Sequence, residues 1–503
     1  MKGASGSISP GDLPAEDLRR LGHEVADWIA DYVASVGDLR VFPDVVPGDV
    51  RRSLPAAPPE AGESMEAALA DFRDIIVPGV THWNHPAFFG YFAITGSGPG
   101  ILGEMLSAAL NVNAMVWRSS PAATELEEVA TDWLRQLVGL PDDFDGVIND
   151  TASHSTLYAL AAAREVAYPE VHDGGLFGLP RGRVYASEHA HSSVEKAVMT
   201  LGFGRSGYRT IPSDDAFRMR TDALEAAMEE DEAAGIRPVA VVPTLGTTSV
   251  TSLDPVGEIV PLARAHGAWV HVDAAYGGPA AIVPELRPLL SGWEGADSIV
   301  INPHKWLFTP TDCSTLYCRR PGVLVRAFSL IPEYLRSTEQ GDVKNLMDYG
   351  VALGRRFRAL KLWFVLRWFG RDGIVANIRE HVRLARLLES WADASEDWEV
   401  AAPVPLGLVC LRHAPPRMSD ERADDINQLI LDRVNGSGKA FLSHTKLHGR
   451  FVLRVAVGNL KTTERHVAAL WDLLRESAAA ATSDCPSRGP GVSAARRPPA
   501  HPR

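Results

Sequence analysis

Hydrophobic and polar positions alternate in blocks from residue 98 to about residue 373, and these blocks predict strands and helices in turn. Short β-branched runs are typical of buried strands, and the longer stretches between them have the spacing of amphipathic helices. The predicted strands are 146–149, 182–187, 238–243, 268–272, 297–301 and 314–318. The predicted helices are 122–138, 153–166, 192–202, 221–234, 255–266 and 353–369. This alternation predicts an α/β fold with a largely parallel, mixed sheet covered by helices.

The N-terminal part of the chain has a different pattern. Residues 15–35 have helical periodicity, a proline-rich connector covers 43–59, and a second helix is expected around 64–77. These helices are amphipathic and have little hydrophobic core of their own. We therefore expect residues 1–97 to form a helical dimerisation arm that packs on another subunit.

The rest of the chain divides into three further regions. Residues 98–373 would form the large domain, and residues 374–478 a small α/β domain with a strand at 451–457 and a helix at 462–477. Residues 479–503 are rich in Pro, Ala and Arg, a composition that predicts a disordered tail.

Composition and charge exclude several classes of partner. The 503 residues are 46% hydrophobic and 22% charged, which is ordinary for a globular protein. A net charge of −13 disfavours nucleic acid and anionic membranes as partners. The cysteines fit no metal spacing and are too few for a disulfide framework, so we expect no metal site and a cytoplasmic location. They are Cys313, Cys318, Cys410 and Cys485.

Neither a signal peptide nor a membrane span is expected. The stretch Met1–Ser7 has no apolar core. The richest apolar run, Leu360–Gly370, contains Lys361 and Arg367 and is too short to cross a bilayer.

Two charged residues follow neighbouring predicted strands. Asp273 lies in His-Val-Asp-Ala-Ala-Tyr (271–276), and Lys305 lies in Ile-Asn-Pro-His-Lys-Trp (301–306), 305 − 273 = 32 positions later. Taken singly, they could be a structural ion-pair acid and a surface lysine. Together they can hold opposite sides of one flat ring. Pyridoxal phosphate needs this pair, because a lysine forms its Schiff base and an acid keeps its pyridine nitrogen protonated.

Other polar residues follow the remaining strands, where ligands bind in open α/β sheets. Thr151, Ala152 and Ser153 open a helix, so their N–H groups and hydroxyls are suited to a phosphate, although such residues are also ordinary helix caps. His191 is either a loop histidine or a ring stacked on the cofactor. Thr244 is either a turn residue or a cofactor ligand. Their succession along one edge favours a cofactor site.

Longer motifs resemble the pyridoxal-phosphate-dependent group II amino-acid decarboxylases, specifically the aromatic-L-amino-acid decarboxylase family. The resemblance extends from about residue 15 to residue 475. Besides the two motifs above, it is carried by Thr-His-Trp-Asn-His-Pro-Ala-Phe-Phe-Gly-Tyr-Phe (81–92), Ser-Ser-Pro-Ala-Ala-Thr-Glu-Leu-Glu (119–127), Ala-His-Ser-Ser-Val-Glu-Lys-Ala (190–197) and Leu-Gly-Arg-Arg-Phe-Arg (353–358). It implies the fold type I of pyridoxal-phosphate-dependent transferases and an obligate homodimer with shared active sites.

The resemblance also implies roles for individual residues. Lys305 would be the Schiff-base lysine, Asp273 the partner of the pyridinium, and His191 the stacking residue that also meets the substrate carboxylate. The other cofactor-binding residues would be Thr151, Ala152, Ser153 and Asn302 at the phosphate and Thr244, Ala275 and His304 around the ring. Asp150 and His154 depart from the family, which often has glycine at the first position and an acidic or small residue at the second. An acid beside a phosphate is unfavourable unless it points away.

Tyr334 lies in the polar stretch 332–345, which is expected to form a lid. In the family, the matching tyrosine returns a proton after CO₂ leaves, and relatives with phenylalanine there make aldehydes oxidatively. Tyr334 therefore implies simple decarboxylation, with Lys305, His191 and Asp273 as the other catalytic residues. Oxidative aromatic acetaldehyde synthesis, transamination and a non-catalytic binding role are the alternatives.

The family's substrate pocket matches apolar positions of this chain, some supplied by the neighbouring subunit. These positions are Trp83, Phe92, Ile94, Met115 and Trp117. Aromatic clusters also occur in cores, but these offer no cation for an acidic substrate. Gly354 matches a position where plant relatives that use indoles resemble this chain and those that use phenols often have serine. The missing side chain leaves room for a bicyclic ring, so tryptophan is favoured over phenylalanine, Dopa or tyrosine. Asn113, where relatives are often apolar, acts against that order.

Overall fold

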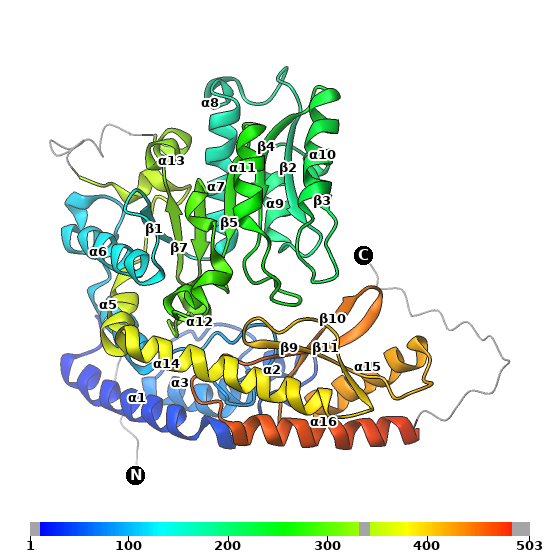
Figure 1. Ribbon diagram of the computed structural model, residues 1–503. Helices are drawn as coiled ribbons and strands as arrows, with labels where there is room; N and C mark the ends of the chain where they lie inside the picture. Colours follow the sequence, from blue (N-terminus) through cyan, green and yellow to red (C-terminus); the bar gives the residue numbers. More distant parts are fainter. Residues whose placement is uncertain (1–10, 331–342, 485–503) are drawn as a thin grey trace, which may run out of the picture.

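The computed structural model describes residues 11–330 and 343–484, and its main feature is a seven-stranded sheet (Figure 1). The strand order is β1–β7–β6–β5–β4–β2–β3. The strands are β1 (Asp145–Asn149), β2 (Gly182–Ser187), β3 (Tyr208–Ile211), β4 (Arg237–Val242), β5 (Trp269–Asp273), β6 (Ser298–Ile301) and β7 (Ser314–Cys318). Strand β7 is antiparallel to both β1 and β6, and the other pairs are parallel. The predicted largely parallel, mixed sheet is confirmed.

Helices cover both faces of this sheet (Figure 1). They are α6 (Pro121–Val138), α7 (Ala152–Ala167), α8 (Val171–Gly174), α9 (Ser193–Thr200), α10 (Thr221–Ala233), α11 (Val256–Ala265) and α13 (Pro321–Phe328). The five of these that were predicted, and the predicted strands, agree with the structure within two residues at each end. Buried alanines along α7 let this helix approach the sheet closely, and its first residue lies at the carboxyl end of β1.

Helix α14 was predicted incorrectly at both ends. It covers Ala359–Asp393 rather than 353–369. Residues 353–358 are not helical, because Arg355 is buried and held by Glu127 and by the Ala114 and Ile148 carbonyls. At the other end the helix continues past Gly370, whose φ of 56° and ψ of −174° put a kink between two helical stretches.

A second, antiparallel sheet lies beneath the large one (Figure 1). Its strands are β8 (Trp398–Val400), β9 (Leu408–His413), β10 (Ser443–Leu447) and β11 (Arg450–Ala456), in the order β10–β11–β9–β8. Helices α15 (Asp420–Ser437) and α16 (Glu464–Asp484) pack on it. The expected tail begins too early, since residues 479–484 continue α16, and residues 485–503 lie outside the described ranges. The division into domains remains a prediction; α14 runs through the expected boundary at residue 373.

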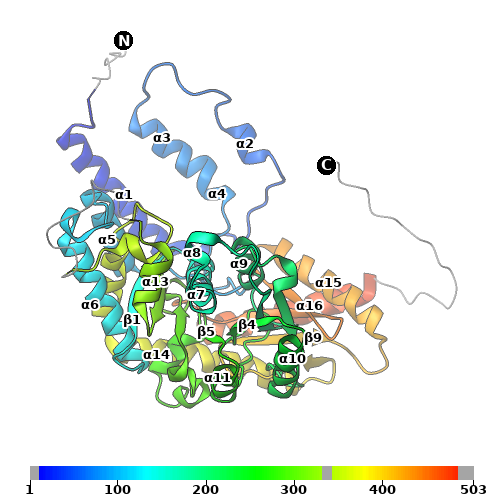
Figure 2. The ribbon, with the colours of Figure 1, turned by 90° about the horizontal axis from the view of Figure 1, so that it is seen from above.

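The N-terminal helices stand away from the rest of the molecule (Figure 2). They are α1 (Ala15–Ser35), α2 (Asp49–Ser53), α3 (Met65–Asp71) and α4 (Val77–Gly79), with a π-helical turn at Phe72–Ile76 between the last two. The helix expected at 64–77 is confirmed as one continuous helical stretch over 65–79, with the π-helical turn in its middle. Leu21 is the one buried residue of these four helices, so they have little core within one chain.

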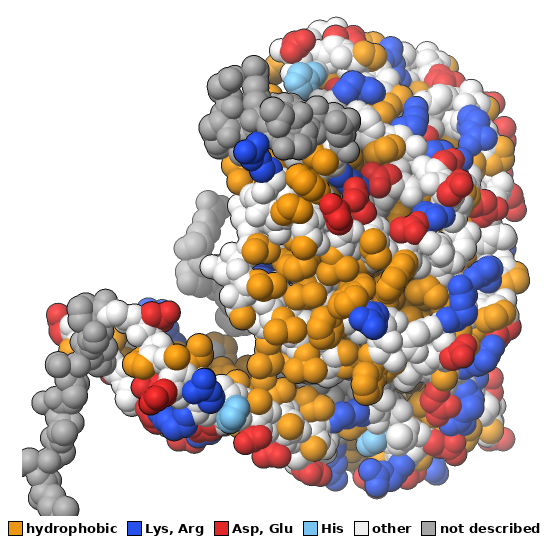
Figure 3. Space-filling model, turned by 90° about the vertical axis from the view of Figure 1, so that its left-hand side faces the viewer, with side chains coloured by type: hydrophobic (Ala, Val, Ile, Leu, Met, Phe, Trp, Pro, Cys, Tyr) orange, Lys and Arg blue, Asp and Glu red, His pale blue; other side chains and the backbone are white. Residues whose placement is uncertain are grey.

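One side of the molecule is strongly hydrophobic (Figure 3). Helix α5 (Gly98–Leu110) packs on α14, and the two form a groove of about 570 Å³. Large exposed apolar side chains here include Leu102, Leu106, Leu110 and Trp368, which is 73% exposed. A hydrophobic area of this kind marks an interaction surface. No helix within the described residues is long and apolar enough to cross a bilayer.

Candidate active site

A cavity of about 170 Å³ opens at the carboxyl ends of the parallel strands of the large sheet. Its lining comes from the segments that follow β1, β2, β4, β5 and β6. The lining residues are Thr151, Ala152, Ser153, His191, Thr244, Gly246, Thr248, Asp273, Ala275, Tyr276, Asn302, His304 and Lys305. The fold thus brings together all ten residues that the sequence suggested for the cofactor, although their individual roles remain predictions.

Lys305 and Asp273 enter this cavity from neighbouring parallel strands. Asp273 is the last residue of β5, and Lys305 lies on the short helix α12 (Pro303–Trp306) that directly follows β6. Burial lowers the pKa of the Lys305 amine, and the negative charge of Asp273 opposes that shift. A lysine with a lowered pKa has more of the neutral, nucleophilic amine at neutral pH.

The start of α7 forms the anion-binding end of the cavity. Thr151 precedes the helix, and Ala152 and Ser153 are its first two residues, so several backbone N–H groups lack partners inside the helix. Asp150 does not line this cavity. Its carboxylate lies 3.7 Å from His154 Nδ1 and 4.0 Å from Arg358, beside a neighbouring small cavity. The departure from the family at Asp150 therefore adds no second acid to the lining beside Asp273.

Two histidines of the cavity are neutral at physiological pH. His191 Nδ1 accepts the N–H of Ser193 at 3.2 Å, and partial burial lowers the pKa of His191, so its proton is on Nε2. His304 Nδ1 accepts the N–H of Cys313 at 3.0 Å. Burial, and then the charge of Lys305, lower the pKa of His304 to about 4. Neutral imidazoles can lie against an aromatic ring without adding charge to it.

The lining fits a planar, phosphorylated pyridine such as pyridoxal phosphate. Thr244 Oγ1 and Asn302 Oδ1 are buried, and neither has a hydrogen-bond partner within the described residues. Buried polar atoms normally have partners, so these two are free for a ligand. With the N–H groups at α7, the acid and the amine, they supply contacts for a phosphate, a ring and an aldehyde carbon.

Of the predicted substrate residues, His191 lines this cavity, and Phe92 lies next to it without being among the lining residues. Its ring stacks on that of Tyr276 with centroids 3.8 Å apart, and Lys305 Nζ lies 5.3 Å from its centroid. Trp83 instead stacks against Tyr91, with centroids 5.6 Å apart. Ile94, Met115 and Trp117 are not among the lining residues, and Gly354 lines the neighbouring cavity with Asp150. A single chain therefore does not gather the expected substrate pocket, and Tyr334 lies outside the described residues.

Three lining residues were missed by the sequence reasoning. Gly246 and Thr248 follow β4 in the same turn as Thr244, so their position after a buried strand was an available signal. Tyr276 belongs to the motif of Asp273. Its ring lies between those of Phe92 and Trp306, with the Trp306 centroid 4.7 Å away. These rings form an apolar wall next to Lys305.

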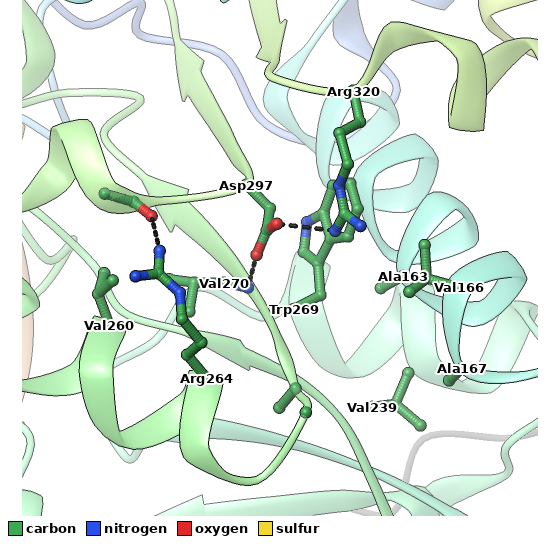
Figure 4. A pocket seen from close by; sticks show the side chains of 13 residues that line it. Ala163, Val166, Ala167, Val239, Val260, Arg264, Trp269, Val270, Asp297 and Arg320 are labelled. Carbon is green, nitrogen blue, oxygen red and sulfur yellow. Dashed lines mark hydrogen bonds and ion pairs between the residues drawn. The ribbon is translucent and has the colours of Figure 1, made fainter.

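Another cavity, of about 270 Å³, lies at the opposite edge of the sheet, near the amino ends of β4 and β5 (Figure 4). Small apolar side chains line it together with three charged ones. Asp297 accepts hydrogen bonds from Arg320 at 2.8 Å and from the Val270 N–H at 2.9 Å, and Arg320 lies over the Trp269 ring. Its acid is thus already paired, and ligands of α/β sheets bind at the other edge.

The chain is similar in sequence and in structure to known proteins. A family model described as the pyridoxal-dependent decarboxylase conserved domain matches residues 47–414. The aromatic-L-amino-acid decarboxylase of Sus scrofa is 42% identical over 484 residues, which cover 93% of this chain and 97% of that protein. The phenylacetaldehyde synthase of Arabidopsis thaliana is 39% identical over 488 residues, covering 95% and 99%. The crystal structure of Oryza sativa TDC with PLP and tryptamine has a TM-score of 0.91 and 39% identity, covering 94% and 99%.

Proposed function

Because this chain belongs to the pyridoxal-dependent decarboxylases, and within them to the aromatic-L-amino-acid decarboxylase family, we propose that it converts an aromatic L-amino acid to the arylethylamine and CO₂. The observation that carries the proposal is the meeting of Lys305, Asp273, His191 and the start of α7 in one cavity. We propose a cytoplasmic location as well, in line with the buried free cysteines.

Pyridoxal 5′-phosphate, when bound, supplies an electron sink for the bond that breaks between Cα and the carboxylate. Residues of this chain would hold it at three points. Thr151, Ala152 and Ser153 would bind its phosphate, Asp273 would keep its ring nitrogen protonated, and Lys305 would hold its aldehyde carbon.

The chain's own groups would then direct the reaction. His191 has its proton on Nε2, so it can donate to the substrate carboxylate while its ring carries no charge. Phe92 and Tyr276 exclude water beside Lys305, which strengthens the electrostatic interactions there. Tyr334 would return a proton to Cα, and Lys305 would take part in release of the amine.

A homodimer would complete the substrate pocket. Met115 and Gly354 lie outside the Lys305 cavity of their own chain, and the broad apolar face that includes α5 is exposed (Figure 3). A second copy on that face would bury Leu102, Leu106 and Trp368. We therefore propose a dimer whose partner supplies part of each active site, which size-exclusion chromatography with light scattering would test.

Tryptophan is the proposed preferred substrate, followed by phenylalanine, Dopa or tyrosine. Apolar residues and the missing side chain at Gly354 support a bicyclic ring, and a similar structure was solved with tryptamine. Values of kcat/KM for tryptophan, phenylalanine, tyrosine, Dopa, histidine and glutamate test this order. A preference for histidine or glutamate would contradict the proposed pocket.

Oxidative aldehyde synthesis is the second candidate, because a phenylacetaldehyde synthase is 39% identical over nearly the whole chain. Tyr334 argues against it on the resemblance to the family. Amine, aldehyde, CO₂ and hydrogen peroxide should be measured together in one reaction. Stoichiometric amine and CO₂ without peroxide support decarboxylation, whereas aldehyde with peroxide supports the second candidate. A protein that forms no product but binds the amino acid would have a non-catalytic role.

A further inference from the structure

Asp254 is a buried carboxylate that lies outside the cavity, in the connection between β4 and α11. Its Oδ2 accepts the N–H of Thr244 at 2.8 Å, and its Oδ1 accepts the N–H of Met219 at 2.7 Å. In return, the N–H of Asp254 donates to the Thr244 carbonyl at 3.0 Å. Side chain and backbone therefore both fasten Asp254 to Thr244.

Thr244 is in turn paired with the acid of the active site. It forms a parallel bridge with Asp273, in which the Leu245 N–H donates to the Asp273 carbonyl at 2.8 Å and the Asp273 N–H donates to the Pro243 carbonyl at 2.9 Å. Thr244 also lines the cavity with a hydroxyl that has no partner within the described residues. A shift of the Thr244 backbone would thus move both a cofactor contact and the strand end beside Asp273.

No cation of the described residues forms an ion pair with Asp254. The charged groups that act on it are Asp214 and Arg218, on the facing loop, and these two pair with each other at 2.7 Å. Burial therefore dominates and raises the pKa of Asp254 to about 6, although its two N–H bonds act in the opposite direction.

This raised pKa means that the ionised carboxylate opposes folding at neutral pH. Asp254 binds its proton more tightly in the folded protein than in the unfolded chain. Its contribution to the free energy of unfolding is therefore fully present below the pKa of an unfolded aspartate and is lost as the pH rises through about 6. A group that costs stability in its working state is more typical of a functional site than of a packing role.

We propose that Asp254 is a positioning residue of the cofactor site, whose carboxylate fixes Thr244 in register beside Asp273 so that the Thr244 hydroxyl meets the cofactor. The proposal rests on the proposed function and adds a residue to it. Protonation would place an O–H against one of the two N–H donors and remove one hydrogen bond. The effect of Asp254 is therefore strongest above about pH 6.

Titration of the apoprotein with pyridoxal phosphate tests this without any turnover. Asp254→Asn keeps the shape and exchanges one acceptor for a donor, and Thr244→Val removes the hydroxyl. We expect each to weaken binding roughly tenfold, the worth of about one hydrogen bond. If both substitutions act through Thr244, the double variant should bind pyridoxal phosphate no more weakly than the single variant with the lower affinity. Unchanged binding in Asp254→Asn, or losses that multiply in the double variant, would overturn the proposal.

The pH dependence provides a second test. The Kd of Asp254→Asn divided by the Kd of the original protein should be large above about pH 6, where Asp254 is ionised, and should fall toward one at lower pH, where it is protonated. Because the cofactor titrates in the same way with both proteins, its own titration cancels in this ratio. Arg218→Ala changes an exposed side chain and leaves Asp214 unopposed, so the acid limb of cofactor binding should move to higher pH. A constant ratio, or an unmoved limb in Arg218→Ala, would refute the role. Amine formation by the original protein separately tests the proposed function.

Discussion

The substitution Gly354→Ser should change the preference between substrates without destabilising the fold, because the structure leaves room for the new side chain. A Cβ on Gly354 would have Asn113 Nδ2 as its nearest neighbour, at 3.9 Å, which is ordinary van der Waals contact. Gly354 is exposed within one chain and its φ lies outside the region that favours glycine. We expect a folding cost below about 0.5 kcal/mol, as at other open surface positions.

The effect on catalysis should instead depend on the substrate ring. In the proposed pocket, a hydroxymethyl group at residue 354 takes space from the second ring of an indole and leaves a phenol unaffected. One added group of this size in a binding pocket costs about 1–3 kcal/mol, or a factor of 10–200 in kcat/KM. The ratio of kcat/KM for tryptophan to that for tyrosine should fall by that factor. A coupled amine assay with both substrates, together with a thermal melt, measures the two effects.

Gly350→Ser is the matched control in the same segment. A Cβ there would approach Tyr158 Cε2 to 2.5 Å, so the Tyr158 ring would have to move. Overpacking of this kind costs about 1–3 kcal/mol and should lower the melting temperature without changing the substrate ratio. The reasoning would be refuted if Gly354→Ser lowered kcat/KM equally for both substrates, or if it melted as early as the control.

Three further predictions follow from the site and from the core behind it. Lys305→Ala should abolish turnover, and borohydride should no longer attach the cofactor covalently to the protein, which mass spectrometry would measure. Multiple turnovers in that variant would show that Lys305 is not the Schiff-base lysine. Tyr334→Phe should divert product from amine to aldehyde with oxygen uptake, and an unchanged amine yield would exclude Tyr334 as the proton donor. Glu127→Ala should destabilise the protein by about 3–5 kcal/mol, because it leaves the buried Arg355, 2.8 Å away, without its carboxylate. Denaturant unfolding would measure this, and a loss below 1 kcal/mol would contradict it.

Most of the sheet was predictable from sequence because its strands are short, buried and bounded by turn residues. β3 was missed, since Tyr208–Ile211 has four residues and is only partly buried, as suits a strand at the edge of the sheet. The predicted start of α14 was too early because Arg355 is held by partners far away in the sequence. The local hydrophobic periodicity contains no information on such contacts. Tertiary contacts there override helical propensity.

The cofactor residues were predictable for a related reason. Parallel strands bring their carboxyl ends to one edge, so residues such as Thr244 and Lys305 meet once the strands are placed. The direction of the Asp150 side chain was not predicted, because one of its two partners, Arg358, lies more than 200 positions away, although the other, His154, is only four positions away. Likewise, Met115 and Gly354 do not meet Lys305 within one chain, so the sequence of one subunit gives no geometric signal for them.

The kink at Gly370 has a consequence for the relation between the two sheets. Helix α14 passes from the large sheet toward the small one, and a Cβ on Gly370 would meet nothing within 4 Å. The space beside Gly370 is open, and the backbone torsions of this residue set the angle at which the second half of α14 leaves the first. Because only glycine adopts φ 56° with ψ −174° at low energy, any other residue would straighten or strain this joint. Gly370 thus sets the direction of a helix that contacts α6, beside the large sheet, as well as β8 and β9 of the small sheet.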